Sequence, residues 1–200
     1  MSRILIIGAS GNMGKRYAAI LKYHDRQVAF ADVLDTPKQQ AALAAKSDGV
    51  IVCTPTDTHA EIIEYLPADK PILCEKPLTK NVDELDLMLK KRVQMVFQYS
   101  ILATAPQPGF SMYDYYRHGA DGLAWDCLQI IGLAKGECHL AEESPIWRCH
   151  INGQRMDIAH MDAAYVHMVR LWLRHPDAQD KGLIREIHHK TKEYADAKRA

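Results

Sequence analysis

The strongest constraint on the fold is a regular alternation of short apolar runs and helix-like segments through the first hundred residues. The apolar runs occupy residues 3–7, 27–33, 49–53, 71–74 and 93–99. Between them, apolar residues recur at helical spacing, and two helices are expected to begin at Thr36 and at a capping box of Asn81 with Glu84. Buried strands alternating with helices predict a parallel sheet covered on both faces, which is a doubly wound α/β fold.

The alternation stops just after residue 100, where several helix- and strand-breaking residues follow one another: Thr104, Pro106, Pro108 and Gly109. We therefore predict a first domain over residues 1–102 and a smaller α+β domain over residues 103–200. In the second domain the spacing predicts helices over residues 111–118 and 156–174, with short strands between them.

Composition excludes several classes of partner. The chain has 25 Lys and Arg against 25 Asp and Glu, so no net charge attracts nucleic acid or an anionic membrane. No apolar stretch approaches the roughly 20 residues of a membrane span, and the apolar run near the amino terminus is too short for a signal peptide. We expect a cytoplasmic protein whose partner is a small molecule, with function located in a local site.

The five cysteines are odd in number and lack C-x-x-C spacing, which predicts reduced thiols. The pairs Cys138-His139 and Cys149-His150 leave a zinc site open as an alternative. Adjacent strand residues face opposite sides, so each pair would supply only one ligand to a common site. We therefore expect no metal.

A glycine-rich turn follows the first predicted strand. Gly8, Gly11 and Gly14 stand three apart, where the backbone must approach a phosphate group closely. Their neighbours Ser10, Asn12 and Met13 complete the turn and the start of the next helix, whose free N–H groups and dipole favour an anion. The turn is typical of dinucleotide binding in a Rossmann domain.

Asp32 lies at the end of the second predicted strand, where a carboxylate can accept hydrogen bonds from both hydroxyls of an adenosine ribose. The same charge would repel a 2′-phosphate. Val33 and Leu34 follow it, so no arginine is placed to bind that phosphate. We predict NAD as the cofactor, with NADP less favoured.

Two further segments resemble the Gfo/Idh/MocA oxidoreductase family: Cys53-Thr-Pro-Thr-Asp-Thr-His59 and Glu75-Lys-Pro-Leu78. The resemblance covers the first hundred residues. It implies that Thr54, Pro55, Thr56 and His59 shape the pocket beneath the nicotinamide and that Glu75 binds the neighbouring ribose. It further implies that Lys76 reaches the substrate and that the bond to Pro77 is cis.

In the second half, residues 156–160 are similar to a family variant that opens a long helix. On such a helix, Asp157 and His160 would share one face. With an ordinary pKa near 6.5, His160 could take the hydroxyl proton, while Asp157 orients the imidazole or contacts substrate. We predict these two residues as the acid–base partners of Lys76.

The resemblance implies an NAD-dependent dehydrogenase that transfers hydride between the nicotinamide and a secondary alcohol or carbonyl of a small sugar- or cyclitol-like metabolite. The family's second domain is usually larger, so a second subunit of a homo-oligomer could be needed to complete the pocket. A non-catalytic NAD(H)-binding sensor with the same fold is the alternative. A sensor has no chemical need for Lys76 or His160, which favours the enzyme.

Overall fold

The computed structural model describes residues 2–96 without a gap and shorter segments of the second half: 115–116, 140–141, 148–151, 154–157, 161–177, 181–182, 184–185 and 188–189. The chain divides into two compact units. The first comprises Met1–Val96 with Val169–Lys181, and the second comprises Phe97–Met168 with Gly182–Ala200. The expected boundary at residue 102 lies outside the described residues and stays a prediction.

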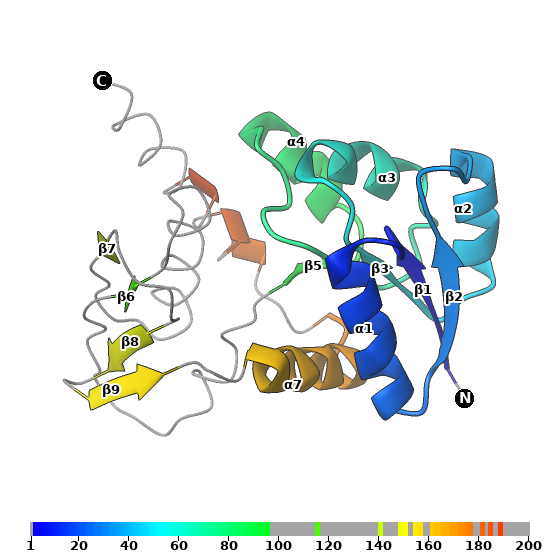
Figure 1. Ribbon diagram of the computed structural model, residues 1–200. Coiled ribbons are helices and arrows are strands. Elements are labelled where there is room, and N and C mark those ends of the chain that lie inside the picture. Colours follow the sequence, from blue (N-terminus) through cyan, green and yellow to red (C-terminus); the bar gives the residue numbers. More distant parts are fainter. Residues whose placement is uncertain are drawn as a thin grey trace. The chain divides into compact units, whose positions relative to one another are not determined.

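The first unit is built on a five-stranded parallel sheet with the strand order β2-β1-β3-β4-β5 (Figure 1). The strands are β1 (Arg3–Ile7), β2 (Gln27–Ala31), β3 (Gly49–Val52), β4 (Ile72–Cys74) and β5 (Val93–Met95). The side chains of Leu5, Ile6 and Ile7 are completely buried, as expected for a central strand covered on both faces. The doubly wound fold is confirmed.

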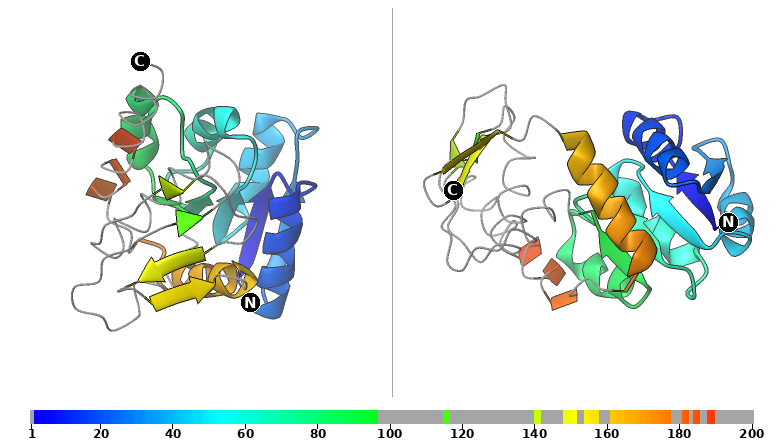
Figure 2. Two further views of the ribbon diagram at one scale, coloured as in Figure 1. Left: turned by 60° about the vertical axis from the view of Figure 1, so that its left-hand side comes forward. Right: turned by 90° about the horizontal axis from the view of Figure 1, so that it is seen from below.

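Four helices connect these strands: α1 (Asn12–Tyr23), α2 (Pro37–Ala45), α3 (His59–Tyr65) and α4 (Val82–Leu89). The chain passes from β1 to β2 through α1 in one direction and from β2 to β3 in the other. Because such crossovers are right-handed, α1 covers one face of the sheet and α2, α3 and α4 cover the opposite face (Figures 1 and 2). The order of strands reverses beside β1, and the carboxyl end of such a switch point is where ligands bind.

Helices α2 and α4 begin after the capping residues expected from the sequence, but only α2 has a complete capping box. Thr36 accepts a hydrogen bond from the Gln39 N–H at 3.3 Å, and the Gln39 side chain returns to the Thr36 backbone, which completes a capping box. The capping box expected at Asn81 is wrong. Asn81 caps α4 through the N–H of Asp83, whereas the Glu84 carboxylate accepts from the Thr79 hydroxyl at 2.6 Å.

A segment from the second half of the sequence belongs to the first unit. The last part of α7 (Met161–Arg174) packs on the sheet face that α1 covers (Figures 1 and 2). Its Trp172 is 3% exposed, and a Cβ added to Gly49 would lie 3.0 Å from the indole ring. Beyond the helix, Arg92 forms an ion pair with Asp177.

The described part of the second unit contains a four-stranded sheet ordered β7-β6-β8-β9. Its strands are β6 (Tyr115–Tyr116), β7 (Leu140–Ala141), β8 (Arg148–Ile151) and β9 (Gln154–Asp157). Two predictions are therefore wrong. The helix expected over residues 111–118 contains a strand, and the helix expected from residue 156 begins only at Met161, because Met156 and Asp157 pair with β8.

Among all the residues that the structure describes, no helix is long and apolar enough to span a membrane.

Candidate cofactor-binding and active site

The glycine-rich turn after β1 leaves no room for side chains at two of its three glycines. Gly8 has a φ of +91°, and a Cβ there would lie 2.9 Å from the backbone of Cys53. A Cβ on Gly14 would lie 2.3 Å from the carbonyl oxygen of Gly8. At Gly11 the nearest atom would be 3.4 Å away, which is ordinary contact. Gly8 and Gly14 thus allow the turn to close tightly against β3 and the start of α1.

The amino terminus of α1 has the features of an anion site. The helix begins at Asn12, as expected, and its N-cap residue is Gly11, which provides no side-chain cap. The backbone N–H groups of Asn12, Met13 and Gly14 therefore stand at the positive end of the helix dipole. This arrangement suits a pyrophosphate, which would accept hydrogen bonds from these groups.

Asp32 follows β2 directly and faces the same turn. Its carboxylate accepts hydrogen bonds from the N–H of Ser10 at 2.6 Å and of Val33 at 2.9 Å. The contact with Ser10 is the main cause of the lowered pKa of Asp32. Asp32 is therefore an anion at neutral pH, held beside the glycine-rich turn.

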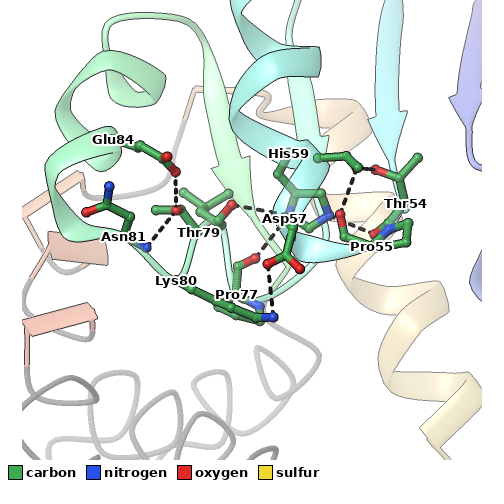
Figure 3. A network of polar contacts seen from close by, with 11 residues as sticks. Thr54, Pro55, Asp57, His59, Pro77, Thr79, Lys80, Asn81 and Glu84 are labelled. Carbon is green, nitrogen blue, oxygen red and sulfur yellow. Dashed lines mark hydrogen bonds and ion pairs between the residues drawn. The ribbon is translucent and has the colours of Figure 1, made fainter. Parts of the chain in front are cut away.

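The segment after β3 is joined to the segment after β4 by a buried histidine (Figure 3). Nε2 of His59 lies 2.9 Å from the carbonyl oxygen of Thr54. Its Nδ1 lies 3.0 Å and 3.2 Å from the carbonyl oxygens of Pro77 and Leu78. The His59 side chain is completely buried, so it can act on a pocket only through the backbone that it holds.

The other residues of the first motif lie in a short turn. Thr56 begins a 3-10 helix, Thr56–Thr58, that leads into α3. The Thr58 hydroxyl lies 2.8 Å from the Thr54 hydroxyl oxygen and 2.7 Å from the carbonyl oxygen of Pro55. These contacts fix the backbone of Thr54 and Pro55 at the carboxyl end of β3.

Burial is the main cause that lowers the pKa of His59 from its ordinary 6.5. The unfolded chain binds this proton more readily than the folded chain, so the stabilisation present above pH 6.5 is lost as the pH falls toward the depressed value. We expect His59→Gln to flatten the pH dependence of the free energy of unfolding between pH 7.5 and roughly pH 5. Denaturant titrations across that interval measure it.

The exposed His175 is the control for this prediction. The variant His175→Gln should keep the slope of the unmodified protein. A parallel slope for His59→Gln would show that the buried imidazole does not contribute to the pH dependence.

Glu75 lies at the end of β4 and is 9% exposed. Its Oε1 accepts a hydrogen bond from the Tyr17 hydroxyl at 2.6 Å, and its Oε2 accepts from the Lys76 N–H at 3.1 Å. Tyr17 comes from α1 and is completely buried. Nothing in the local sequence distinguishes Tyr17 from an ordinary apolar position of a helix, because its partner lies 58 residues away.

Lys76 is half-buried at the carboxyl end of the sheet, between the buried Glu75 and Pro77. The Lys76–Pro77 peptide bond is cis, as the resemblance implied. Beyond it, the exposed Lys80 pairs with Asp57 at 2.9 Å, which connects the two loops again at the surface (Figure 3). The first unit therefore brings Gly8, Asp32, Thr54 and Lys76 to one edge of its sheet.

Cys53, which follows β3 directly, and Cys74, the last residue of β4, are free thiols. Burial is the main cause that raises the pKa of Cys53 to about 12 and that of Cys74 well above its ordinary value. Both remain protonated thiols at neutral pH, so neither is a nucleophile.

The structure does not support the shared helix face expected for Asp157 and His160. Asp157 ends strand β9, and α7 begins four residues later, at Met161. His160 lies outside the described residues, so its role in proton transfer stays a prediction. Among the described residues no group of three His, Cys, Asp or Glu is placed to bind a metal. Cys138 and His139, which belong to the zinc alternative, lie outside them.

Comparison with known proteins gives matches over part of the chain. Residues 41–98 match the model of an oxidoreductase family with an NAD-binding Rossmann fold, GFO_IDH_MocA. Inositol 2-dehydrogenase of Rhizobium meliloti is 48% identical over 48 residues, which are 24% of this chain and 14% of that protein. Myo-inositol 2-dehydrogenase of Thermotoga maritima is 42% identical over 45 residues, 22% of this chain and 14% of that protein. The matched segment is thus a small part of each curated relative.

Solved structures share the fold over more of the chain. The WlbA (WbpB) dehydrogenase from Thermus thermophilus, crystallised with NAD and UDP-GlcNAcA, superposes with a TM-score of 0.69 at 13% identity. That alignment covers 96% of this chain and 94% of the other. A myo-inositol dehydrogenase from Corynebacterium glutamicum gives a TM-score of 0.64 at 14% identity, covering 96% of each chain. Residues 41–98 are thus similar to the NAD-binding Rossmann fold of that oxidoreductase family, and the strand order of the first unit agrees with such a fold.

Proposed function

We propose that this protein is an NAD-dependent dehydrogenase that acts on a secondary alcohol or carbonyl of a small polar metabolite of the sugar or cyclitol type. The observation that supports this most directly is the convergence of a phosphate-binding turn, an acidic residue after β2 and the Glu75-Lys76-Pro77 segment at one edge of the sheet. The substrate class follows the inositol dehydrogenases that match residues of the same domain.

The residues present fit a dinucleotide. A side chain at Gly8 or Gly14 would fill the turn, and the start of α1 has no side-chain cap, so both the space and the donors suit a pyrophosphate. Asp32 would accept hydrogen bonds from the adenosine ribose, and Glu75 from the ribose beside the nicotinamide. Thr54 and Pro55 would form the wall of the nicotinamide pocket. When bound, NAD supplies the hydride acceptor.

Lys76 is the proposed catalytic residue. Its ammonium group would donate a hydrogen bond from Nζ to the reacting oxygen of the substrate and stabilise the negative charge that develops there as the hydroxyl proton leaves. His59 fixes the backbone of the loops after β3 and β4 from within. We further propose that the imidazole of His160, oriented by Asp157, accepts the proton of the substrate hydroxyl.

A calorimetric titration with NAD, NADH, NADP and NADPH, at fixed salt and pH, tests the proposal first. We expect NAD and NADH to bind with Kd values in the micromolar range or below, and more tightly than their phosphorylated counterparts. Absence of binding by all four would contradict the dehydrogenase assignment. Binding without turnover of any sugar or cyclitol would favour an NAD(H) sensor.

Asp32 is expected to decide between the two cofactors. In Asp32→Ala, NAD loses the hydrogen bonds to a charged acceptor and NADP is relieved of a repulsion. The ratio of the two Kd values should move toward NADP by about 1–3 kcal/mol, or roughly 5- to 150-fold. The same titration measures it. Asp69→Asn, at an exposed position before β4, should leave the ratio unchanged. An unchanged ratio in Asp32→Ala would mean that the discriminating residue lies elsewhere.

A further inference from the structure

The buried contact between Tyr17 and Glu75 joins the two halves of the proposed cofactor site. Tyr17 lies on α1, whose first turn forms the phosphate-binding end, and its hydroxyl donates to Glu75 Oε1 at 2.6 Å. Glu75 lies beside Lys76 at the end of β4, on the other side of β1 and β3 from β2. One helix therefore holds both the anion site at its amino terminus and the carboxylate next to the proposed catalytic lysine.

The surroundings of Glu75 make this donor important. The carboxylate is 9% exposed, and its charge contributes to the raised pKa values of the neighbouring thiols of Cys53 and Cys74. Its hydrogen-bond donors include the Tyr17 hydroxyl, which donates to Oε1, and the Lys76 N–H, which donates to Oε2. A buried carboxylate depends on such donors to remain ionised.

We propose that Tyr17 is a positioning residue that keeps Glu75 ionised and oriented toward the nicotinamide ribose. This inference rests on the proposed function, since it assigns Glu75 to the cofactor. Tyr17 lies outside both sequence motifs. Its phenol, within the core, supplies a hydrogen bond to a carboxylate that water reaches poorly.

The test is Tyr17→Phe, which removes only the hydroxyl, with Tyr23→Phe as the control because Tyr23 lies on the same helix and is 75% exposed. Without the donor, Glu75 should take up a proton more readily than in the unmodified protein. NAD affinity, measured by calorimetry from pH 5 to 8, should then weaken at a higher pH than in the unmodified protein or in Tyr23→Phe.

A double variant separates positioning from general damage to the fold. In Glu75→Gln the side chain carries no charge at any pH, so adding Tyr17→Phe should not change the pH profile further. An unshifted profile in Tyr17→Phe, or a further shift in the double variant, would overturn the proposal. A uniform loss of affinity at every pH would indicate a merely structural role and would also overturn it.

Difference infrared spectroscopy tests Tyr17 without any cofactor, so it remains decisive if NAD does not bind and the proposed function fails. The carboxylate band of Glu75, identified by its loss in Glu75→Gln, should convert to the protonated form at a higher pH in Tyr17→Phe. The single variant Glu75→Gln, in which Tyr17 is intact, gives a second readout. It should shift the phenolic C–O stretch of Tyr17. Absence of both changes would show that the hydrogen bond does not control Glu75.

Discussion

Lys76→Ala should lower turnover by about 10²- to 10⁴-fold while the Kd for NAD stays within a few-fold of the unmodified value. The reason is the position of Lys76, which follows Glu75, the proposed ligand of the nicotinamide ribose, and lies on the opposite side of β1 from the loop that carries Asp32. Removing its ammonium group deletes the donor to the reacting oxygen and leaves the phosphate-binding turn intact. Single-turnover absorbance of the nicotinamide, with a panel of cyclitols and sugars, measures the first quantity, and calorimetry measures the second.

Lys80→Ala is the matched control, because Lys80 is an exposed lysine four residues along the same loop. Its ion pair with Asp57 lies at the surface, where such pairs contribute little to stability. The variant should therefore keep both turnover and affinity. Turnover in Lys76→Ala equal to that of Lys80→Ala would remove Lys76 from the mechanism.

Gly14→Ala is expected to have the largest effect on the cofactor site. Its methyl group would lie 2.3 Å from the Gly8 carbonyl oxygen and 2.6 Å from the Ala9 Cα, and both are backbone atoms that cannot rotate away. The turn must open or α1 must shift, at a cost of about 1–3 kcal/mol or more in the free energy of unfolding. Since the same turn would hold the pyrophosphate, NAD affinity should fall by at least about 100-fold.

Gly11→Ala provides the comparison within the same turn. A methyl group there meets its nearest neighbour at 3.4 Å, and Gly11 does not have a positive φ. Thermal unfolding should place Gly11→Ala near the unmodified protein and Gly14→Ala far from it. Equal losses in the two variants would mean that the close approach at Gly14 does not shape the turn.

The first half of the fold could be predicted because its signals are local. Strands β1 to β4 are short apolar runs, and capping residues such as Thr36 mark helix starts directly in the sequence. The glycine turn and the position of Asp32 follow from the same strand order. The positions of Thr54, Glu75 and Lys76 at the carboxyl edge of the sheet also follow from it.

The predictions that were wrong or incomplete concern residues whose structure depends on contacts with other parts of the chain. Met156 and Asp157 have a sequence compatible with a helix start, but pairing with Cys149 and Arg148 places them in a strand. Glu84 was expected to cap α4, yet the Thr79 hydroxyl competes for its carboxylate. Tyr17 has helical spacing whether it packs against a leucine or donates to a glutamate. Tertiary pairing overrides local preference in each case.

Because Trp172 packs over Gly49, the first unit is complete only after the late segment that carries Trp172 has been synthesised. Residues 2–96 emerge from the ribosome first and contain the whole parallel sheet. The sheet face beneath Trp172 remains open until Val169–Lys181 has been made, more than seventy residues later. At about 5–20 residues per second, the nascent domain would expose apolar surface for several seconds before its own chain returns to cover it. During that interval the sheet surface that Trp172 covers in the folded protein is open to chaperones.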